Sequence, residues 1–210
     1  MRLTFSVSLL VVAGAATAGA QATIREYRPE VIVTSPRARG FGAQVLAEQH
    51  LAMGDLAPNE RILGLGVVSP VFLHVRAALE ARQVKQPTVL EHRYIPTIYS
   101  TIPLGSGCEA RNRTRGEIRD VDRTWSRRWQ HRSTVGRDVA IAGTEVFTYG
   151  QFDLSYDSRF RTLNRTEKTV GFRVPVSGAA SIDTFFTRQD DTRRGPHTLI
   201  VGGALLRIAL

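Results

Sequence analysis

Cysteine is almost absent from this chain of 210 residues, which contains only Cys108. A single cysteine excludes a disulfide bond within the chain and any CxxC or zinc-knuckle site. The spacing of the five histidines matches no metal-ligand pattern: they lie at positions 50, 74, 92, 131 and 197. We therefore expect no bound metal and no other cofactor.

Familiar catalytic and nucleotide-binding motifs are missing as well. The sequence contains no GxSxG, HExxH, GxxxxGK[ST] or GxGxxG element. These patterns hold a nucleophile, a zinc ion or a phosphate in a defined backbone setting. Without them the sequence gives no reason to expect an enzyme.

Long apolar runs are confined to the N-terminus. Met1-Arg2 is a short positive start, Leu3 to Ala16 is apolar, and Ala18-Gly19-Ala20 has the small-x-small pattern that signal peptidase accepts. The pattern predicts a cleaved signal peptide at residues 1–20 and one mature domain at 21–210, with a membrane anchor as the rival interpretation. No later stretch reaches the roughly 18 apolar residues of a transmembrane helix.

The mature chain is basic. Removal of residues 1–20 takes away one of the 28 Lys and Arg, which leaves 27 against 19 Asp and Glu, a formal net charge of +8. A basic patch often indicates a nucleic-acid partner. Because this chain is expected outside the cytoplasm, we expect no nucleic-acid partner.

Apolar and polar residues alternate with a period of two over most of the mature chain, which is typical of strands with one apolar face. In the segment 163–176 one parity is apolar (Val170, Phe172, Val174, Val176) and the other is polar or charged (Arg165, Glu167, Thr169, Gly171, Arg173). Segments 71–84 and 200–210 behave similarly. Helix formers are frequent in 74–84, so a helix is the rival there.

Turn signals rich in Pro, Gly, Ser and Asp separate these segments, and no long linker or repeat interrupts them. An exported chain with charges on one strand face and aliphatic residues on the other fits a barrel with a polar lumen and a lipid-facing exterior. With about 9–11 residues per strand, ten to twelve strands fit the chain best. We therefore predict an all-β, closed, antiparallel, up-and-down transmembrane β-barrel.

Arginine is concentrated in one region. Nine arginines lie in the stretch from Glu109 to Arg137. On a strand, one side of this stretch would carry Arg111, Arg113, Arg115, Glu117 and Arg119, which share one parity. Arginine facing lipid at the membrane midplane costs about 2–4 kcal/mol, so this column is expected inside the barrel or beyond the membrane. It predicts either an anion-attracting pore or phosphate site, or a set of interstrand Arg–carboxylate pairs that fill a narrow barrel.

The same alternation identifies candidates for the lumen lining, and these are Arg76, Glu80, Arg82, Glu91, Arg93, Glu117, Arg119, Arg165, Glu167 and Arg173. The histidines are interpreted as polar lumen residues. Aromatic residues near expected strand ends are candidates for an interfacial girdle, namely Tyr94, Tyr99, Trp125, Trp129, Tyr149 and Tyr156.

From about residue 60 onward the order of short motifs resembles an uncharacterised bacterial family, domain of unknown function 2490. The matching pieces are Leu90-Glu91-His92-Arg93, the segment 127–132, Thr144-Glu145-Val146-Phe147, the segments 163–165 and 171–173, and the segment 185–189 before a closing apolar strand. The resemblance implies an outer-membrane barrel with no known enzymatic activity. The apolar last strand also resembles the assembly signal of outer-membrane barrels, although it ends in Leu210 and not in an aromatic residue.

These observations predict a small, monomeric barrel in the bacterial outer membrane. Its expected partners are outer-membrane lipid and lipopolysaccharide, with the barrel-assembly machinery engaging the last strand. An open lumen would make it a narrow anion-preferring pore, and interlocked charges would make it a structural or surface-binding barrel. The alternatives are a lipid A-modifying enzyme and a soluble periplasmic lipocalin-like carrier.

Overall fold

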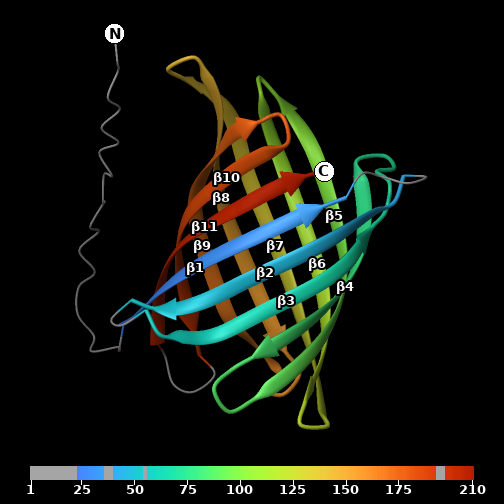
Figure 1. Ribbon diagram of the computed structural model, residues 1–210, viewed down its shortest axis with the longest axis vertical. Helices are drawn as coiled ribbons and strands as arrows, with labels where there is room; N and C mark the ends of the chain where they lie inside the picture. The colour runs from blue at the N-terminus through green and yellow to red at the C-terminus, as the bar shows by residue number, and fades with distance from the viewer. Residues whose placement is uncertain (1–22, 36–39, 54–55, 193–196) are drawn as a thin grey trace.

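The computed structural model describes residues 23–35, 40–53, 56–192 and 197–210, in which eleven strands form a closed barrel (Figure 1). The predicted signal peptide, residues 1–20, lies outside the described part. The strands are β1 Thr23–Thr34, β2 Gly42–Ala52, β3 Pro58–Val68, β4 Val75–Lys85, β5 Leu90–Gly105, β6 Cys108–Val121, β7 Thr124–Ile141, β8 Thr144–Asp157, β9 Thr162–Ser177, β10 Ala180–Asp191 and β11 His197–Ala209. Among the described residues no helix is long and apolar enough to cross a membrane.

Each strand pairs antiparallel with the next along the chain, and β1 pairs with β11 to close the ring. This closing pair is parallel and runs in register from Thr23 opposite Thr198 to Thr34 opposite Ala209. The predicted range of ten to twelve strands is confirmed. The prediction of a wholly antiparallel barrel was wrong at this pair, because an odd number of alternating strands brings the first and last together in the same direction.

The two ends of the barrel are named here by the strands that meet there. At the N-terminal end β1 begins, and the turns between β4 and β5, β6 and β7, and β8 and β9 lie there (lower in Figure 1). At the C-terminal end β11 finishes, beside the turns between β5 and β6, β7 and β8, and β9 and β10. The first residue of β1 and the last residue of β11 therefore lie at opposite ends.

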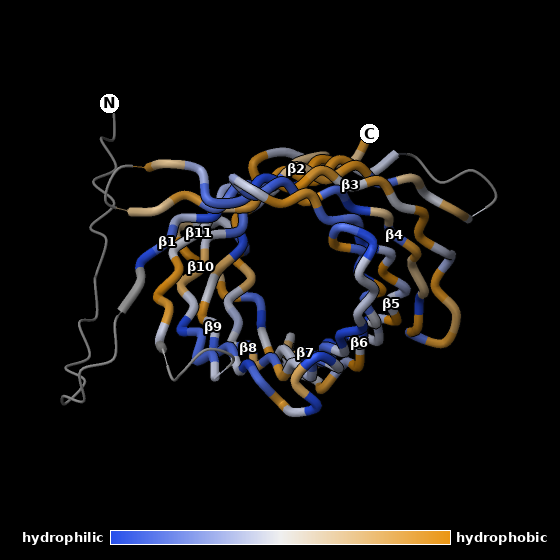
Figure 2. The backbone as a smooth tube through the Cα atoms, turned by 90° about the horizontal axis from the view of Figure 1, so that it is seen from below, coloured by the Kyte–Doolittle hydropathy of each residue, from blue (hydrophilic) through white to orange (hydrophobic). Residues whose placement is uncertain are grey.

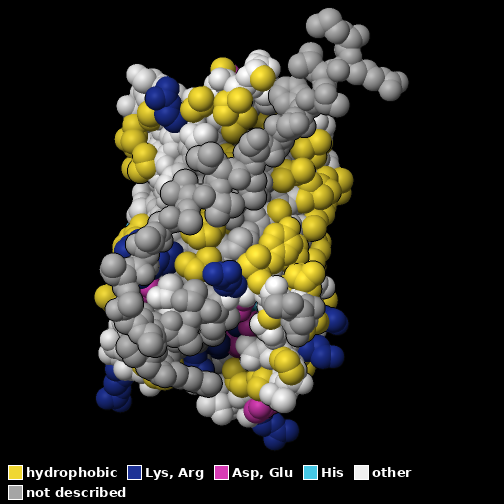
Figure 3. Space-filling model, turned by 90° about the vertical axis from the view of Figure 1, so that its left-hand side faces the viewer, with side chains coloured by type: hydrophobic (Ala, Val, Ile, Leu, Met, Phe, Trp, Pro, Cys, Tyr) yellow, Lys and Arg dark blue, Asp and Glu magenta, His cyan; other side chains and the backbone are white. Residues whose placement is uncertain are grey.

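The apolar face of the strands lies outside. On β3, Leu63, Leu65 and Val67 are 52–67% exposed, whereas Ile62 on the opposite parity is 3% exposed. On β9, Val170, Phe172 and Val176 face outward as predicted. Figure 2 shows this alternation along the strands, and Figure 3 shows hydrophobic side chains gathered over an outer face.

The predicted strand at 71–84 is shorter than expected. Phe72 and Val75 are hydrogen-bonded to each other and close a tight turn in which Leu73 and His74 have positive φ angles of 47° and 67°, and β4 begins at Val75. The helix considered for this segment was wrong. Apolar and charged residues alternate here with a period of two. Because β4 pairs with both β3 and β5, this alternation places the apolar residues on one face of the sheet and the charged residues on the other.

One side of the interior is apolar. Ile32, Leu46, Ile62, Val84 and Leu205 pack together beneath the wall formed by β11, β1, β2, β3 and β4. All five are at most 9% exposed. Charged residues line the rest of the interior, including the other inward-facing positions of these same strands, such as Glu30, Glu48 and Arg82.

Glycines make room for aromatic rings on the inner wall. A Cβ added at Gly203 of β11 would overlap the ring of Phe185 on β10, and one added at Gly136 of β7 would overlap the ring of Phe147 on β8. Each ring therefore lies flat against the backbone of its neighbour. These glycine–aromatic pairs place the rings of Phe147 and Phe185 in the lining of the central cavity.

Candidate functional site

Nine of the ten predicted lumen residues lie inside the barrel. Six line the central cavity: Arg82, Arg93, Arg119, Arg165, Glu167 and Arg173. The side chains of Glu80, Glu91 and Glu117 also face inward but are buried against the wall, at 1–8% exposure. Arg76 differs, because it is exposed near the C-terminal end, where its guanidinium carbon lies 4.6 Å from the centre of the Tyr99 ring.

The central cavity has a volume of about 470 Å³ and presents mainly guanidinium groups. Twelve arginines line it, against five glutamates and one aspartate. Other carboxylates, including Glu117, Asp153 and Asp157, are almost fully buried behind the arginines. Short acidic side chains stay near the wall while the long arginines extend inward, so the accessible surface is more cationic than the total interior charge.

An interlocked layer of ion pairs lies near the N-terminal end. Arg119 on β6 donates to Glu91 on β5 and lies 3.4 Å from Asp157 at the end of β8. Arg128 on β7 lies 3.5 Å from Glu117 and 3.6 Å from Asp157. This layer joins four strands and confirms the interpretation of interstrand Arg–carboxylate pairs for this part of the arginine column.

A turn residue extends the same layer outside the strands. Arg159, between β8 and β9, donates to both carboxylate oxygens of Asp157 at 3.0 and 2.7 Å. These hydrogen bonds raise the pKa of the Arg159 guanidinium above its ordinary value. Asp157 therefore carries ion pairs from β6, β7 and the turn at once.

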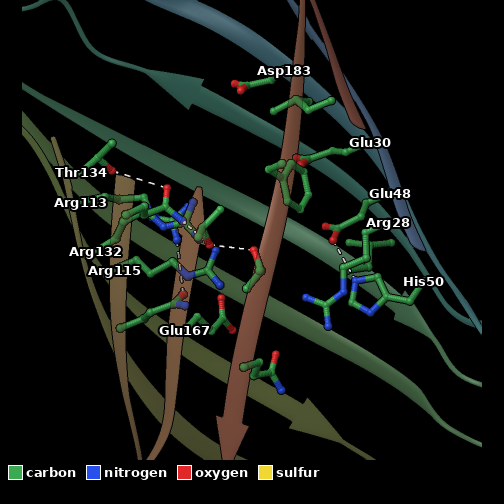
Figure 4. A pocket seen from close by; sticks show the side chains of 18 of the residues that line it. Arg28, Glu30, Glu48, His50, Arg113, Arg115, Arg132, Thr134, Glu167 and Asp183 are labelled. Atoms are coloured by element: carbon green, nitrogen blue, oxygen red, sulfur yellow. Dashed lines mark hydrogen bonds and ion pairs between the residues drawn. The ribbon is translucent and has the colours of Figure 1, made fainter. Parts of the chain in front are cut away.

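The middle of the interior contains a group of arginines with too few acidic partners. Asp153 on β8 is fully buried and lies 2.8 Å from Arg132 and 3.7 Å from Arg113. Arg115 pairs with Glu117 at 2.9 Å. The Nε atoms of Arg113 and Arg115 are buried without a hydrogen-bond partner among the described residues. We name Arg113, Arg115 and Arg132 the arginine cluster (Figure 4).

Acidic residues line the facing wall. Glu30 on β1 and Glu48 on β2 project into the cavity from the side opposite the arginine cluster (Figure 4). His50 is hydrogen-bonded to Glu48 at 2.8 Å and lies 3.8 Å from Glu26. The interior is therefore polarised across its axis, with cationic groups on β6 and β7 and anionic groups on β1 and β2.

The layer toward the C-terminal end combines charge with aromatic rings. Arg111 and Arg173 lie over the ring of Phe147, at 4.4 and 5.6 Å from its centre. Tyr149 and Arg173 both donate to Asp183, at 2.9 and 2.8 Å. The arginines of this layer are thus held in place by both ring and carboxylate contacts.

The acidic wall was not among the residues predicted for the lumen. Glu26, Arg28 and Glu30 share one parity, and so do Glu48 and His50, which is the same signal that identified the other lumen residues. The segments are short and contain apolar residues on both faces, such as Ile32 and Leu46, so the alternation is weaker there. Pairing with β11 and β3 gives these strands their orientation.

Most histidines do not line the lumen. Of those whose side chains are described, only His50 faces the cavity, whereas His92 and His131 lie on the outer face and His74 lies in an exposed turn. The side chain of His197 lies outside the described part. The prediction of lumen histidines was therefore wrong for three positions.

Four of the six aromatic residues predicted for an interfacial girdle lie on the outer face. Tyr94, Trp125, Trp129 and Tyr156 are exposed on the outer face of β5, β7 and β8 toward the N-terminal end. Tyr99 and Tyr149 lie on the inner parity, as their contacts with Arg76 and Asp183 require. Four of the six residues thus occupy the positions expected of a girdle.

No family model matches the chain, and comparisons with curated proteins and with solved structures gave no significant match. The resemblance to domain of unknown function 2490 therefore stays a prediction. Within the described ranges no group of three or more His, Cys, Asp or Glu side chains could hold a metal ion.

Proposed function

We propose that this chain is a bacterial outer-membrane β-barrel whose arginine-lined interior admits small anions. The main support for this proposal is the distribution of side chains across the barrel wall. Leu63, Leu65 and Val170 are exposed outside, and charged residues are enclosed within. A soluble carrier needs the opposite arrangement, with apolar residues around its ligand. A closed barrel also leaves no unpaired edge, which a lipid environment requires.

The anion preference rests on the arginine cluster. Guanidinium groups bind phosphate and carboxylate through several donors in one plane. Arg113 and Arg115 each keep a buried Nε without a partner in the described chain, and Asp153 is the nearest compensating charge to Arg113 and Arg132. An anion in the cavity would supply the missing acceptors.

The first test is the location of the expressed protein. When the full-length chain is expressed, we expect the mature protein in the outer-membrane fraction and a band whose gel migration changes on boiling in detergent. A soluble protein with unchanged migration would contradict the membrane proposal. The same gel then serves as the folding control for every variant.

The second test measures ion selectivity in planar lipid bilayers. We expect wild-type protein to conduct with a reversal potential that indicates anion preference, and Arg113→Gln to reduce the anion-to-cation permeability ratio by about twofold. Arg188→Gln is the matched control, because the side chain of Arg188 is 51% exposed and its ion-pair partner among the described residues is Asp190 on the outer side. An unchanged ratio in Arg113→Gln would contradict the role of the arginine cluster.

A closed structural or surface-binding barrel is the second candidate, and the ion-pair layer near the N-terminal end favours it. Glu91, Arg119 and Asp157 join β5, β6 and β8 along one side of the interior wall at that level. If this layer blocks the axis, wild-type protein will be silent and the double variant Glu91→Gln, Arg119→Gln will conduct. We propose lipopolysaccharide phosphates as ligands of such a barrel, and the assembly machinery as a transient partner of β11.

A further inference from the structure

The outer face of β6 and β7 carries a cluster of polar side chains that is separate from the charged interior. His131 Nδ1 lies 2.8 Å from Thr114 Oγ1, and His131 Nε2 lies 3.2 Å from Ser133 Oγ. Ser133 Oγ also donates to Asn112 Oδ1 at 3.0 Å. The four side chains come from adjacent strands, with Thr114 opposite His131 and Asn112 opposite Ser133 in the register.

This cluster interrupts an apolar surface. Trp129 and Val135 flank it along β7, and Phe152 lies opposite Ser133 on β8. These three residues are 42–58% exposed. Polar and ionisable groups in a lipid-facing wall are costly, and where they occur they mark functional sites more often than structural ones. Ion pairing explains the interior charges, but it gives no reason for a histidine outside.

We propose that Ser133 and His131 form the catalytic dyad of an acyl hydrolase, positioned by Thr114, that acts on ester bonds of membrane lipids. A nucleophile, a base within hydrogen-bond reach and a third group that orients the base define such a site on any fold. The inference rests on the membrane location proposed above, because only then does this face meet lipid. Flanking Trp129, Val135 and Phe152 would contact the acyl chain.

The histidine is already placed for its role. When Nδ1–H donates to Thr114 Oγ1, the neutral ring leaves Nε2 as an acceptor directed at the Ser133 hydroxyl. Ser133 has one proton, so it cannot donate to His131 and to Asn112 together. If the Asn112 side-chain amide rotates by 180°, its NH2 group donates to Ser133 Oγ, and the hydroxyl proton of Ser133 is then free for His131.

The reaction consumes an ester and one water. Ser133 Oγ attacks the carbonyl carbon while its proton passes to His131 Nε2, and the C–O bond to the alcohol breaks as His131 returns the proton to the leaving oxygen. Water then attacks the acyl-serine carbon, gives one proton to His131, and the acid leaves as Ser133 Oγ regains that proton. The amide N–H groups of Asn112 are candidates to stabilise the negative oxygen.

The test uses full-length protein folded in detergent and in phosphatidylglycerol-containing vesicles, with a long-chain alkyl fluorophosphonate as the probe. We expect covalent labelling at Ser133, located by peptide mass mapping, and release of fatty acid from the vesicles. Ser133→Ala and His131→Gln should each reduce labelling and release at least about tenfold. Ser100→Ala is the matched control, because Ser100 lies opposite Asn112 on β5 and should leave both unchanged.

Thr114 is tested as a positioning residue. We expect Thr114→Val to lower kcat with little change in KM, and Thr114→Ser, which restores the hydroxyl, to recover most of it. Heat-modifiable protein that is neither labelled nor active would overturn the proposal, as would activity that persists in Ser133→Ala. Failure of membrane fractionation would overturn the membrane location separately, since labelling in detergent still tests the dyad.

Discussion

At the scale of single residues, Asp153 is the carboxylate shared by two arginines in the middle of the interior. Its carboxylate is fully buried and lies within 4 Å of both Arg132 and Arg113. We expect Asp153→Asn to lower the free energy of unfolding by about 3 kcal/mol, since removing one partner leaves buried cations uncompensated. Urea titration of the lipid-embedded protein, followed by tryptophan fluorescence, measures this change.

Asp190→Asn is the control for Asp153→Asn. Asp190 also pairs with an arginine, Arg188, but both side chains are solvent-accessible, at 32% and 51%. Exposed pairs contribute about 0–1 kcal/mol, so this variant should unfold almost as the wild type does. Equal losses in the two variants would show that enclosure in the barrel does not matter to the pair.

At the scale of elements, the packing between adjacent strands depends on the glycine–aromatic pairs. We expect Gly203→Val to lower the free energy of unfolding by about 1–3 kcal/mol, because the new side chain overlaps the ring of Phe185 on β10. Gly202→Val is the matched control in the same strand, since a Cβ at Gly202 meets no atom within 4 Å. Thermal unfolding of both variants compares them, and a Gly203→Val protein as stable as its control would contradict this packing.

The same strands illustrate what alternation can and cannot predict. In β9 polar or charged residues alternate with apolar residues over most of the strand. The structure places Arg165, Glu167 and Arg173 inside as expected. In β1 and β2 the alternation of polar and apolar residues is less regular, because Ile32 and Leu46 are apolar and also face the interior. Alternation assigns faces, but it does not show which acidic residue meets which arginine, because that depends on the register between strands.

The cluster on β6 and β7 was missed for a related reason. His131 and Ser133 are two residues apart, so on a strand they share a face, and no sequence motif was needed to bring them together. Their partners Thr114 and Asn112 are known only from the register of the neighbouring strand. A polar side chain alone does not assign a histidine to the lumen, because the parity of β7 places His131 outside.

At the scale of the whole molecule, the parallel closure of β1 with β11 makes a prediction of its own. In a Cys108→Ser background, we expect Arg25→Cys near the start of β1 and Leu210→Cys beyond the end of β11 to react with an impermeant maleimide from opposite sides of a sealed vesicle. Labelling of both from one side would contradict the eleven-strand closure. Double labelling after detergent lysis confirms that both sites are reactive.

The odd number of strands also limits how this chain can be rearranged. In a barrel with an even number, the two termini are neighbours, and a short peptide can join them while new ends are opened at any hairpin. Here the start of β1 and the end of β11 are separated by the full length of a strand, although the two strands are hydrogen-bonded side by side. A linker would have to pass back through the barrel or across its apolar exterior, so a circular permutant of this fold needs a connection that spans the barrel, such as an added twelfth strand.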